Sequence, residues 1–148
     1  MADYEEVPPN ADTMVASIRA IGYNLPMAIA DIIDNSISAR AKNIWIDFDW
    51  ASGDPYIRVK DDGRGMTEDE LREAMRLCGK GPDETREPED LGRFGLGLKT
   101  ASFSQCRLLT VSTKVKDGTT STRCWDLDLI EKTKKWQLKL HPPEKAES

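Results

Sequence analysis

The sequence predicts an α/β domain of two layers, in which helices cover one face of a mainly antiparallel sheet. Three observations favour this class. Apolar residues recur at helical spacing over residues 11–22 and 26–41. They alternate with polar residues over 43–50, which is typical of a half-buried strand. Two further strands, 107–116 and 119–129, flank Asp117-Gly118, a pair that favours a tight type I′ hairpin turn.

Composition and charge narrow the classes of function. The chain has 148 residues, of which 39% are apolar and 32% charged, as expected for one globular domain. The net charge of −5 gives no sign that the chain as a whole binds polyanions. Its cysteines, Cys78, Cys106 and Cys124, are odd in number and widely spaced, so neither a zinc site nor a disulfide framework is indicated. We expect reduced thiols, a cytoplasmic location and no membrane span.

The order of the segments predicts one domain with two polar ends. Residues 1–10 are expected to form an arm, residues 11–141 the domain, and residues 142–148 a charged tail. Asp12 or Thr13 is expected to cap the first helix. A last strand is expected after the turn at 132–135, and the core is expected to hold Met27, Met75 and the four tryptophans.

The helix over Pro26–Ala41 carries the main chemical signal. At about 100° per residue, Asp31, Asn35 and Ala39 fall in one arc, while four isoleucines fall in the other: Ile29, Ile32, Ile33 and Ile37. A carboxylate and an amide oxygen one turn apart suit an activated water and a hard cation such as Mg²⁺. The small Ala39 lets a flat group approach the backbone.

A second signal lies at the end of the following hairpin. The turn after residue 50 leads into a strand in which Asp61 shares the inward face with Ile57 and Val59. A carboxylate on that face is costly unless it has a partner. Asp61 begins the glycine turn DDGRGM (61–66), and the Thr67–Glu70 capping box then starts another helix.

The third signal is rich in glycine. Residues 79–91 are charged, interrupted by proline and without periodicity, so we expect a loop. Gly92 to Lys99 (GRFGLGLK) then leads into a helix that ends near Gln105. The segment differs from a Walker P-loop because Leu98 separates Gly97 from the lysine, and the chain has no G-x-G-x-x-G fingerprint.

Together these blocks resemble the GHKL ATPases, which include gyrase B, heat-shock chaperone, histidine kinase and MutL nucleotide domains, and most closely the MORC-like and chaperone-like branch. The matching blocks, in the family's order, are AIADIIDNSISA (28–39), DDGRGM (61–66), DLGRFGLGLKTASF (90–103) and LLTVSTK (108–114). The resemblance implies a Bergerat fold that binds Mg·ATP and hydrolyses it slowly to ADP and phosphate.

The resemblance also implies a role for each matching residue. Asn35 would hold Mg²⁺, and Asp61 would accept a hydrogen bond from the adenine amino group. Thr113 would lie beside that aspartate, and the base would be bordered by Ala39, Gly63, Gly65 and Met66. The phosphates would be wrapped by Gly92, Arg93, Phe94, Gly95, Leu96, Gly97, Leu98 and Lys99, with the Lys99 charge at the terminal phosphate. Residues 79–97 would form a lid.

One residue departs from the family pattern. The usual general base is a glutamate, whereas the matching residue here is Asp31, one methylene shorter. The sequence therefore leaves open a nucleotide-binding switch without meaningful turnover. It also leaves open histidine-kinase-type phosphotransfer, although the single histidine is His141, and an interaction domain with vestigial motifs. The resemblance further implies an ATP-dependent homodimer, more domains or partner proteins, and DNA involvement by analogy alone.

Overall fold

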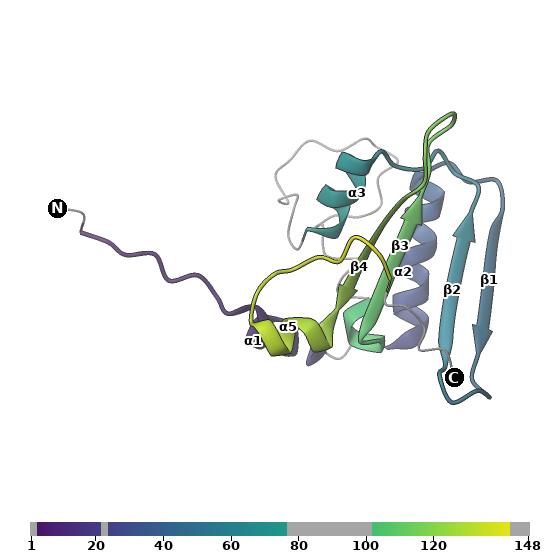
Figure 1. Ribbon diagram of the computed structural model, residues 1–148. Coiled ribbons are helices and arrows are strands. Elements are labelled where there is room, and N and C mark those ends of the chain that lie inside the picture. The colour runs from purple at the N-terminus through teal and green to yellow at the C-terminus, as the bar shows by residue number, and fades with distance from the viewer. Residues whose placement is uncertain (1–2, 22–23, 77–101, 143–148) are drawn as a thin grey trace.

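The computed structural model describes residues 3–21, 24–76 and 102–142 (Figure 1). Residues 3–10 leave the first helix as an exposed segment without helix or strand. Residues 102–105 form a short helical segment in addition to the labelled elements. Those elements, in chain order, are α1 (Ala11–Arg19), α2 (Leu25–Ser38), β1 (Ile44–Asp49), β2 (Tyr56–Asp61), α3 (Glu68–Met75), β3 (Leu108–Thr113), β4 (Ser121–Asp126) and α5 (Leu127–Thr133).

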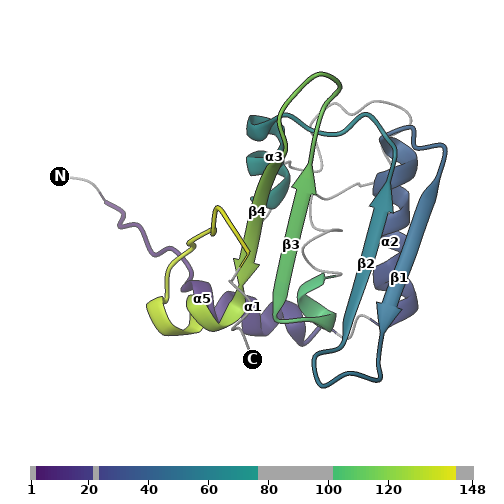
Figure 2. The same ribbon diagram turned by 45° about the vertical axis from the view of Figure 1, so that its right-hand side comes forward.

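The strands form two antiparallel hairpins, so the predicted α/β class is confirmed. β1 pairs with β2 from Ile44 opposite Asp61 to Asp49 opposite Tyr56. β3 pairs with β4 from Leu108 opposite Asp126 to Thr113 opposite Ser121. Within the described residues these are two separate two-stranded sheets, with β2 and β3 as the inner strands and α2 behind the β1–β2 hairpin (Figure 2).

The main core lies on the β3–β4 side of the domain. Trp125 of β4 donates its indole N–H to the Met75 carbonyl at 2.8 Å and meets the Phe103 ring edge to face, with 6.5 Å between the ring centroids. Helices α1, α3 and α5 supply the surrounding apolar side chains. The fully buried members are Leu71, Met75, Phe103, Leu127 and Ile130. This packing fixes α3, and with it the glycine turn that precedes α3.

Local sequence explains where the helices begin. Asn24 caps α2 by accepting a hydrogen bond from the Met27 N–H at 3.0 Å, and Pro26 occupies the first turn. Thr67 caps α3 by accepting from the Glu70 N–H at 3.2 Å, as the capping box predicts. The predicted cap of α1 is wrong, because Asn10 occupies the N-cap position and no side chain caps that end. No helix in these parts of the chain is long and apolar enough to cross a membrane.

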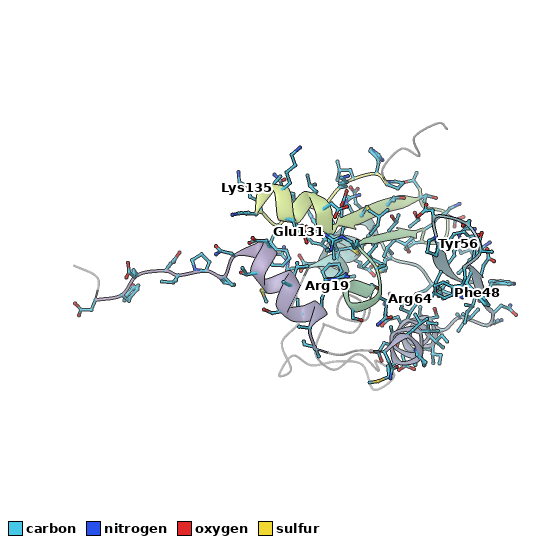
Figure 3. The ribbon with its side chains drawn as sticks, turned by 90° about the horizontal axis from the view of Figure 1, so that it is seen from below. Arg19, Phe48, Tyr56, Arg64, Glu131 and Lys135 are labelled. Atoms are coloured by element: carbon cyan, nitrogen blue, oxygen red, sulfur yellow. The ribbon has the colours of Figure 1, made fainter. Side chains whose placement is uncertain are left out.

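The face of β1 predicted to be half-buried is largely exposed. Ile46, Phe48 and Trp50 are 44%, 60% and 58% exposed, because β1 is an edge strand and α2 packs more closely against β2. Phe48 and Tyr56 lie at the edge of the molecule (Figure 3). The prediction of a core role is confirmed for Met75 and Trp125 and is wrong for four residues: Met27, Trp45, Trp50 and Trp136.

The C-terminal part differs most from the sequence prediction. The second hairpin forms, but its connection covers residues 114–120; Asp117 has φ 63° and Gly118 lacks the positive φ that a type I′ turn requires. The strand predicted to continue to residue 129 ends at Asp126, whose carboxylate caps α5. The predicted last strand is reduced to one bridge between Cys124 and Lys139.

Candidate functional site

The buried face of α2 is centred toward one edge of the arc that the four isoleucines predict. Ala28 and Ser36 are the buried residues of this helix, whereas Ile37 is 52% exposed. At about 100° per residue, the midpoint between the two buried residues falls at Ile32, which is the isoleucine nearest to the stripe of Asn35 and Ala39. The predicted chemical stripe borders the buried face, with Asn35 exposed and Asp31 partly buried.

Asp61 lies at the end of β2 and faces α2. The Ser36 hydroxyl donates a hydrogen bond to Asp61 Oδ2 at 2.7 Å, and the Gly63 N–H donates to Oδ1 at 2.9 Å. Asp61 itself is exposed, unlike the partly buried Ile57 and Val59, so the predicted burial of this carboxylate is wrong and the two hydrogen bonds orient it at the surface beside α2. The carboxylate is therefore fixed between the helix and the glycine turn.

The glycine turn is packed against the end of α2. A Cβ atom on Gly63 would lie 2.8 Å from the Ala39 Cβ, so only glycine fits there. The Arg64 N–H donates to the Ala39 carbonyl at 2.9 Å. Asp62 accepts hydrogen bonds at 2.8 Å from the Asn43 side chain and from the N–H groups of Asn43 and Lys42, and these bonds lower the pKa of its carboxyl. The turn is thus fixed to the connection between α2 and β1.

The other side of the turn contacts the end of β3. Gly65 has φ 72°, and a Cβ there would lie 2.0 Å from the Lys114 carbonyl oxygen. The next residue, Met66, donates its N–H to Thr113 Oγ1 at 2.9 Å. Thr113 is therefore a direct neighbour of the turn that carries Asp61.

The structure thus brings three predicted segments together: the C-terminal half of α2, the DDGRGM turn and the end of β3. The site residues within them are Asn35, Ala39, Asp61, Gly63, Gly65, Met66 and Thr113. Gly92 to Lys99 and the predicted lid over 79–97 lie outside the described residues. Within the described residues, the site consists of a helix face, a carboxylate and a turn of closely packed glycines.

The protein oxygens at this site suit a cation that takes most of its ligands from water and from a bound molecule. In the described segments no three side chains of histidine, cysteine, aspartate or glutamate gather as a metal site. The exposed Asn35 carboxamide offers one hard oxygen. Mg²⁺ accepts such a site, because it commonly takes one or two protein ligands and fills the rest with water and phosphate oxygens.

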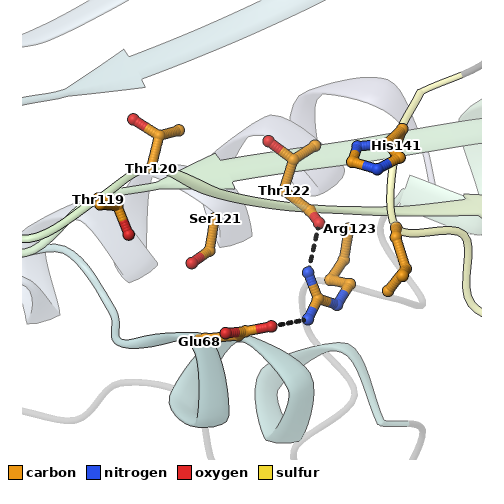
Figure 4. A pocket seen from close by; sticks show the side chains of 8 residues that line it. Glu68, Thr119, Thr120, Ser121, Thr122, Arg123 and His141 are labelled. Carbon is orange, nitrogen blue, oxygen red and sulfur yellow. Dashed lines mark hydrogen bonds and ion pairs between the residues drawn. The ribbon is translucent and has the colours of Figure 1, made fainter.

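Two shallow hollows lie elsewhere on the surface. One, of about 270 Å³, is lined by Trp45, Asp47, Arg58 and Lys60. The other, of about 290 Å³, lies beside Arg123, which donates to the Thr122 carbonyl at 2.7 Å and pairs with Glu68 at 2.6 Å (Figure 4). Neither includes Asp61 or Asn35, so both are separate from the candidate site.

Ser36 is the site residue that the sequence reasoning missed. By helical spacing it falls in the middle of the isoleucine arc, about 20° from Ile29. A hydroxyl on an apolar face requires a hydrogen-bond partner. Asp61 was also predicted to need a partner. Pairing these two requirements would have predicted the hydrogen bond between Ser36 and Asp61 from the sequence.

These features define a class: an α/β domain in which a helix face, a glycine turn and a strand end meet around one carboxylate. Residues 23–148 match the model of the family described as histidine kinase-, DNA gyrase B-, and HSP90-like ATPase. The chain belongs to this family, and the predicted GHKL resemblance is confirmed.

Individual relatives point to the same family. The chain is 34% identical over 91 residues to ATPase morc-1 of Caenorhabditis elegans, covering 62% of this chain and 10% of that protein. It is 41% identical over 76 residues to the human structural maintenance of chromosomes flexible hinge domain-containing protein 1, covering 43% and 4%. It is 33% identical over 94 residues to the DNA mismatch repair protein MutL of Pseudomonas fluorescens, covering 61% and 14%. The chain therefore spans a small part of each.

Proposed function

We propose that this chain binds ATP together with Mg²⁺ and hydrolyses it slowly to ADP and phosphate. The observation that carries the proposal is the fixed Asp61 carboxylate, held at the point where α2, the glycine turn and β3 meet. Membership of an ATPase family supports ATP as the ligand.

The adenine end of the ligand is assigned to the Asp61 side. The Asp61 carboxylate accepts a hydrogen bond from the adenine amino group. The Thr113 oxygen accepts from the Met66 N–H, and its hydroxyl proton remains to donate a hydrogen bond to the bound nucleotide. Ala39 and Met66 border the base. The backbone of Gly63 and Gly65 passes close to it without a side chain in between.

The phosphate end is assigned to the Asn35 side. Asn35 holds Mg²⁺ through its carboxamide oxygen, and the metal neutralises charge on the phosphates when it is bound. The glycine-rich Gly92–Lys99 segment supplies backbone N–H groups, and Lys99 supplies a positive charge at the terminal phosphate. This part rests on the sequence motif.

Hydrolysis is assigned to Asp31. Its carboxylate lies one helical turn from Asn35 and takes a proton from the attacking water as the bond to the terminal phosphate breaks. An aspartate reaches less far than a glutamate, which is why we propose slow turnover. A nucleotide-binding switch without meaningful turnover is the second candidate, and the short Asp31 side chain favours it.

Binding and turnover measured side by side test the proposal. We expect calorimetry to detect Mg·ATP binding by the wild type, and Asn35→Ala to lose at least about tenfold in affinity when Mg²⁺ is present. With EDTA in place of Mg²⁺ the two proteins should differ little. Equal Mg·ATP affinities would remove Asn35 from the metal site. Asp31→Asn separates the two candidates: reduced phosphate release supports hydrolysis, and unchanged release supports the switch.

The nucleotide state is proposed to control closure of residues 79–97 and the association of two copies. Gel filtration with and without a non-hydrolysable ATP analogue tests this, and a monomer in both conditions contradicts it. Because the chain spans 4–14% of the three relatives described above, further domains or partner proteins are also proposed. DNA is proposed as a partner only because one relative is named a DNA mismatch repair protein. A cytoplasmic location stays a proposal.

A further inference from the structure

We infer that Ser36 is a positioning residue that sets the preference of this site for 6-amino purines. Its hydroxyl orients the Asp61 carboxylate, and the orientation of that carboxylate decides which purine edge is accepted. The inference rests on the proposed ATP-binding function and extends it to a residue that has no assigned role.

The burial of Ser36 indicates that its hydroxyl serves to bind Asp61. The residue is 3% exposed and lies on the packed face of α2. A buried hydroxyl without a partner costs free energy, whereas this one donates to Asp61 Oδ2 at 2.7 Å. An alanine at this position would pack against the strand without needing a hydrogen-bond partner. The serine hydroxyl is therefore explained by its hydrogen bond to the Asp61 carboxylate.

The two donors to Asp61 come from different elements and reach different oxygens. Ser36 on α2 bonds Oδ2, and the Gly63 N–H in the turn bonds Oδ1. Two such bonds fix the plane of the carboxylate, which a single bond leaves free to rotate. Gly63 is itself held by close packing on Ala39, so the second donor cannot follow a rotating side chain.

A carboxylate fixed in this way accepts hydrogen bonds and donates none. It is complementary to an exocyclic amino group, as on adenine, and it repels the carbonyl oxygen that hypoxanthine carries at the same position. If Ser36 no longer holds Oδ2, the carboxylate can turn away from that oxygen. The preference between the two bases then falls, even where overall binding persists.

The experiment compares the affinities of Mg·ATP and Mg·ITP by calorimetry. We expect the wild type to prefer ATP, and we expect both Ser36→Ala and Ser36→Cys to reduce the ratio of the two affinities by roughly fivefold to tenfold. Cysteine keeps nearly the same volume and donates only weakly, so it separates the lost hydrogen bond from lost packing. Ser17→Ala is the matched control, because it removes an exposed helical hydroxyl outside the site. It should leave the ratio unchanged.

A double-mutant cycle shows whether Ser36 acts through Asp61. In an Asp61→Asn background, Ser36→Ala should change the ratio less than about twofold. A purely structural role would weaken ATP and ITP equally and leave the ratio intact, and that result overturns the inference. A wild type that binds neither nucleotide instead overturns the proposed function, so the two failures are distinguishable.

Discussion

Thr113 Oγ1 accepts a hydrogen bond from the Met66 N–H at 2.9 Å, and this bond joins the end of β3 to the turn that carries Asp61. The two residues are 47 positions apart in the sequence, and Thr113 is also held in the β3–β4 ladder opposite Ser121. The integrity of the candidate site depends on this connection between the two hairpins.

Thr113→Val removes the acceptor while keeping the shape of the side chain. The part-buried Met66 N–H then loses its partner, which costs about 1–2 kcal/mol of unfolding free energy. Thr110→Val on the same strand is the matched control, since its hydroxyl bonds only the weak acceptor Cys124 Sγ at 3.3 Å. Urea denaturation measures both. Equal losses of unfolding free energy in the two variants would show that the hydrogen bond from Met66 to Thr113 does not stabilise the fold more than the bond from Thr110 does.

Gly65→Ala is expected to destabilise the fold strongly. The residue has φ 72°, and a Cβ would lie 2.0 Å from the Lys114 carbonyl oxygen, so the turn or β3 must move. We expect a loss of at least about 2–3 kcal/mol, measured by thermal unfolding. Gly53→Ala is the control, because nothing lies within 4 Å of its added Cβ. A midpoint for Gly65→Ala close to that of Gly53→Ala would contradict the packing described here.

Asp126 is expected to make stability depend on acid pH. Burial raises the pKa of its carboxyl, but the hydrogen bond and charge of Lys139 and the N–H groups of Leu129 and Asp128 lower it, and the net pKa lies below its ordinary value of 3.8. A lowered pKa means that the folded state favours the charged form. The stabilisation is therefore present above the ordinary pKa and is lost as the pH falls through the folded value.

Asp126→Asn tests this expectation. At neutral pH we expect a loss of about 1 kcal/mol, because the variant loses the ion pair to Lys139 at 2.7 Å and weakens the cap of α5. The difference from wild type should shrink below about pH 4. Asp128→Asn, which removes a 76% exposed carboxylate, should change the stability by less than about 0.5 kcal/mol. A difference that stays constant with pH would show that the charge of Asp126 is not involved.

Cys106 and Cys124 are expected to be slow nucleophiles in the folded protein. Burial raises the pKa of both thiols, so little reactive thiolate is present at neutral pH. Iodoacetamide labelling followed by peptide mapping should be at least about tenfold slower at these two positions in the native state than in denaturant. Rapid native labelling at either position would contradict the burial seen here.

Local patterns predicted the part of the fold that has local causes. Pro26 lies in the first turn of α2, Thr67 begins α3, and alternating residues form β1 and β2, as expected from short stretches of sequence, whereas the capping role of Asn24 was not predicted. Period two predicted that Asp61 lies on the α2 side and needs a partner; Ser36 of α2 does donate to it, although the residue is exposed and not buried. The helix starts and the strand alternation depend on neighbours within a few residues, whereas the identity of the Asp61 partner depends on a contact 25 positions away.

Other features depend on contacts that local patterns do not encode. The segment from Leu127 fits a strand or a helix by its apolar spacing, and the helix forms because Asp126 caps it and Leu127 and Ile130 pack into the core. Which face of β1 is covered depends on where α2 lies, so the exposure of Phe48 was not predictable from alternation. Ser36 acquires its role only when α2 meets the end of β2.

Calorimetric titration of wild type and Asp61→Asn with Mg·ATP is the most direct test of the central claim, that the fixed Asp61 carboxylate is the base-recognising group of an ATP site. We predict a single binding site in the wild type and an affinity at least about tenfold weaker in Asp61→Asn, with thermal unfolding confirming that the variant is folded. No detectable binding by the wild type at millimolar ATP, or equal affinity in a folded Asp61→Asn, would contradict the account.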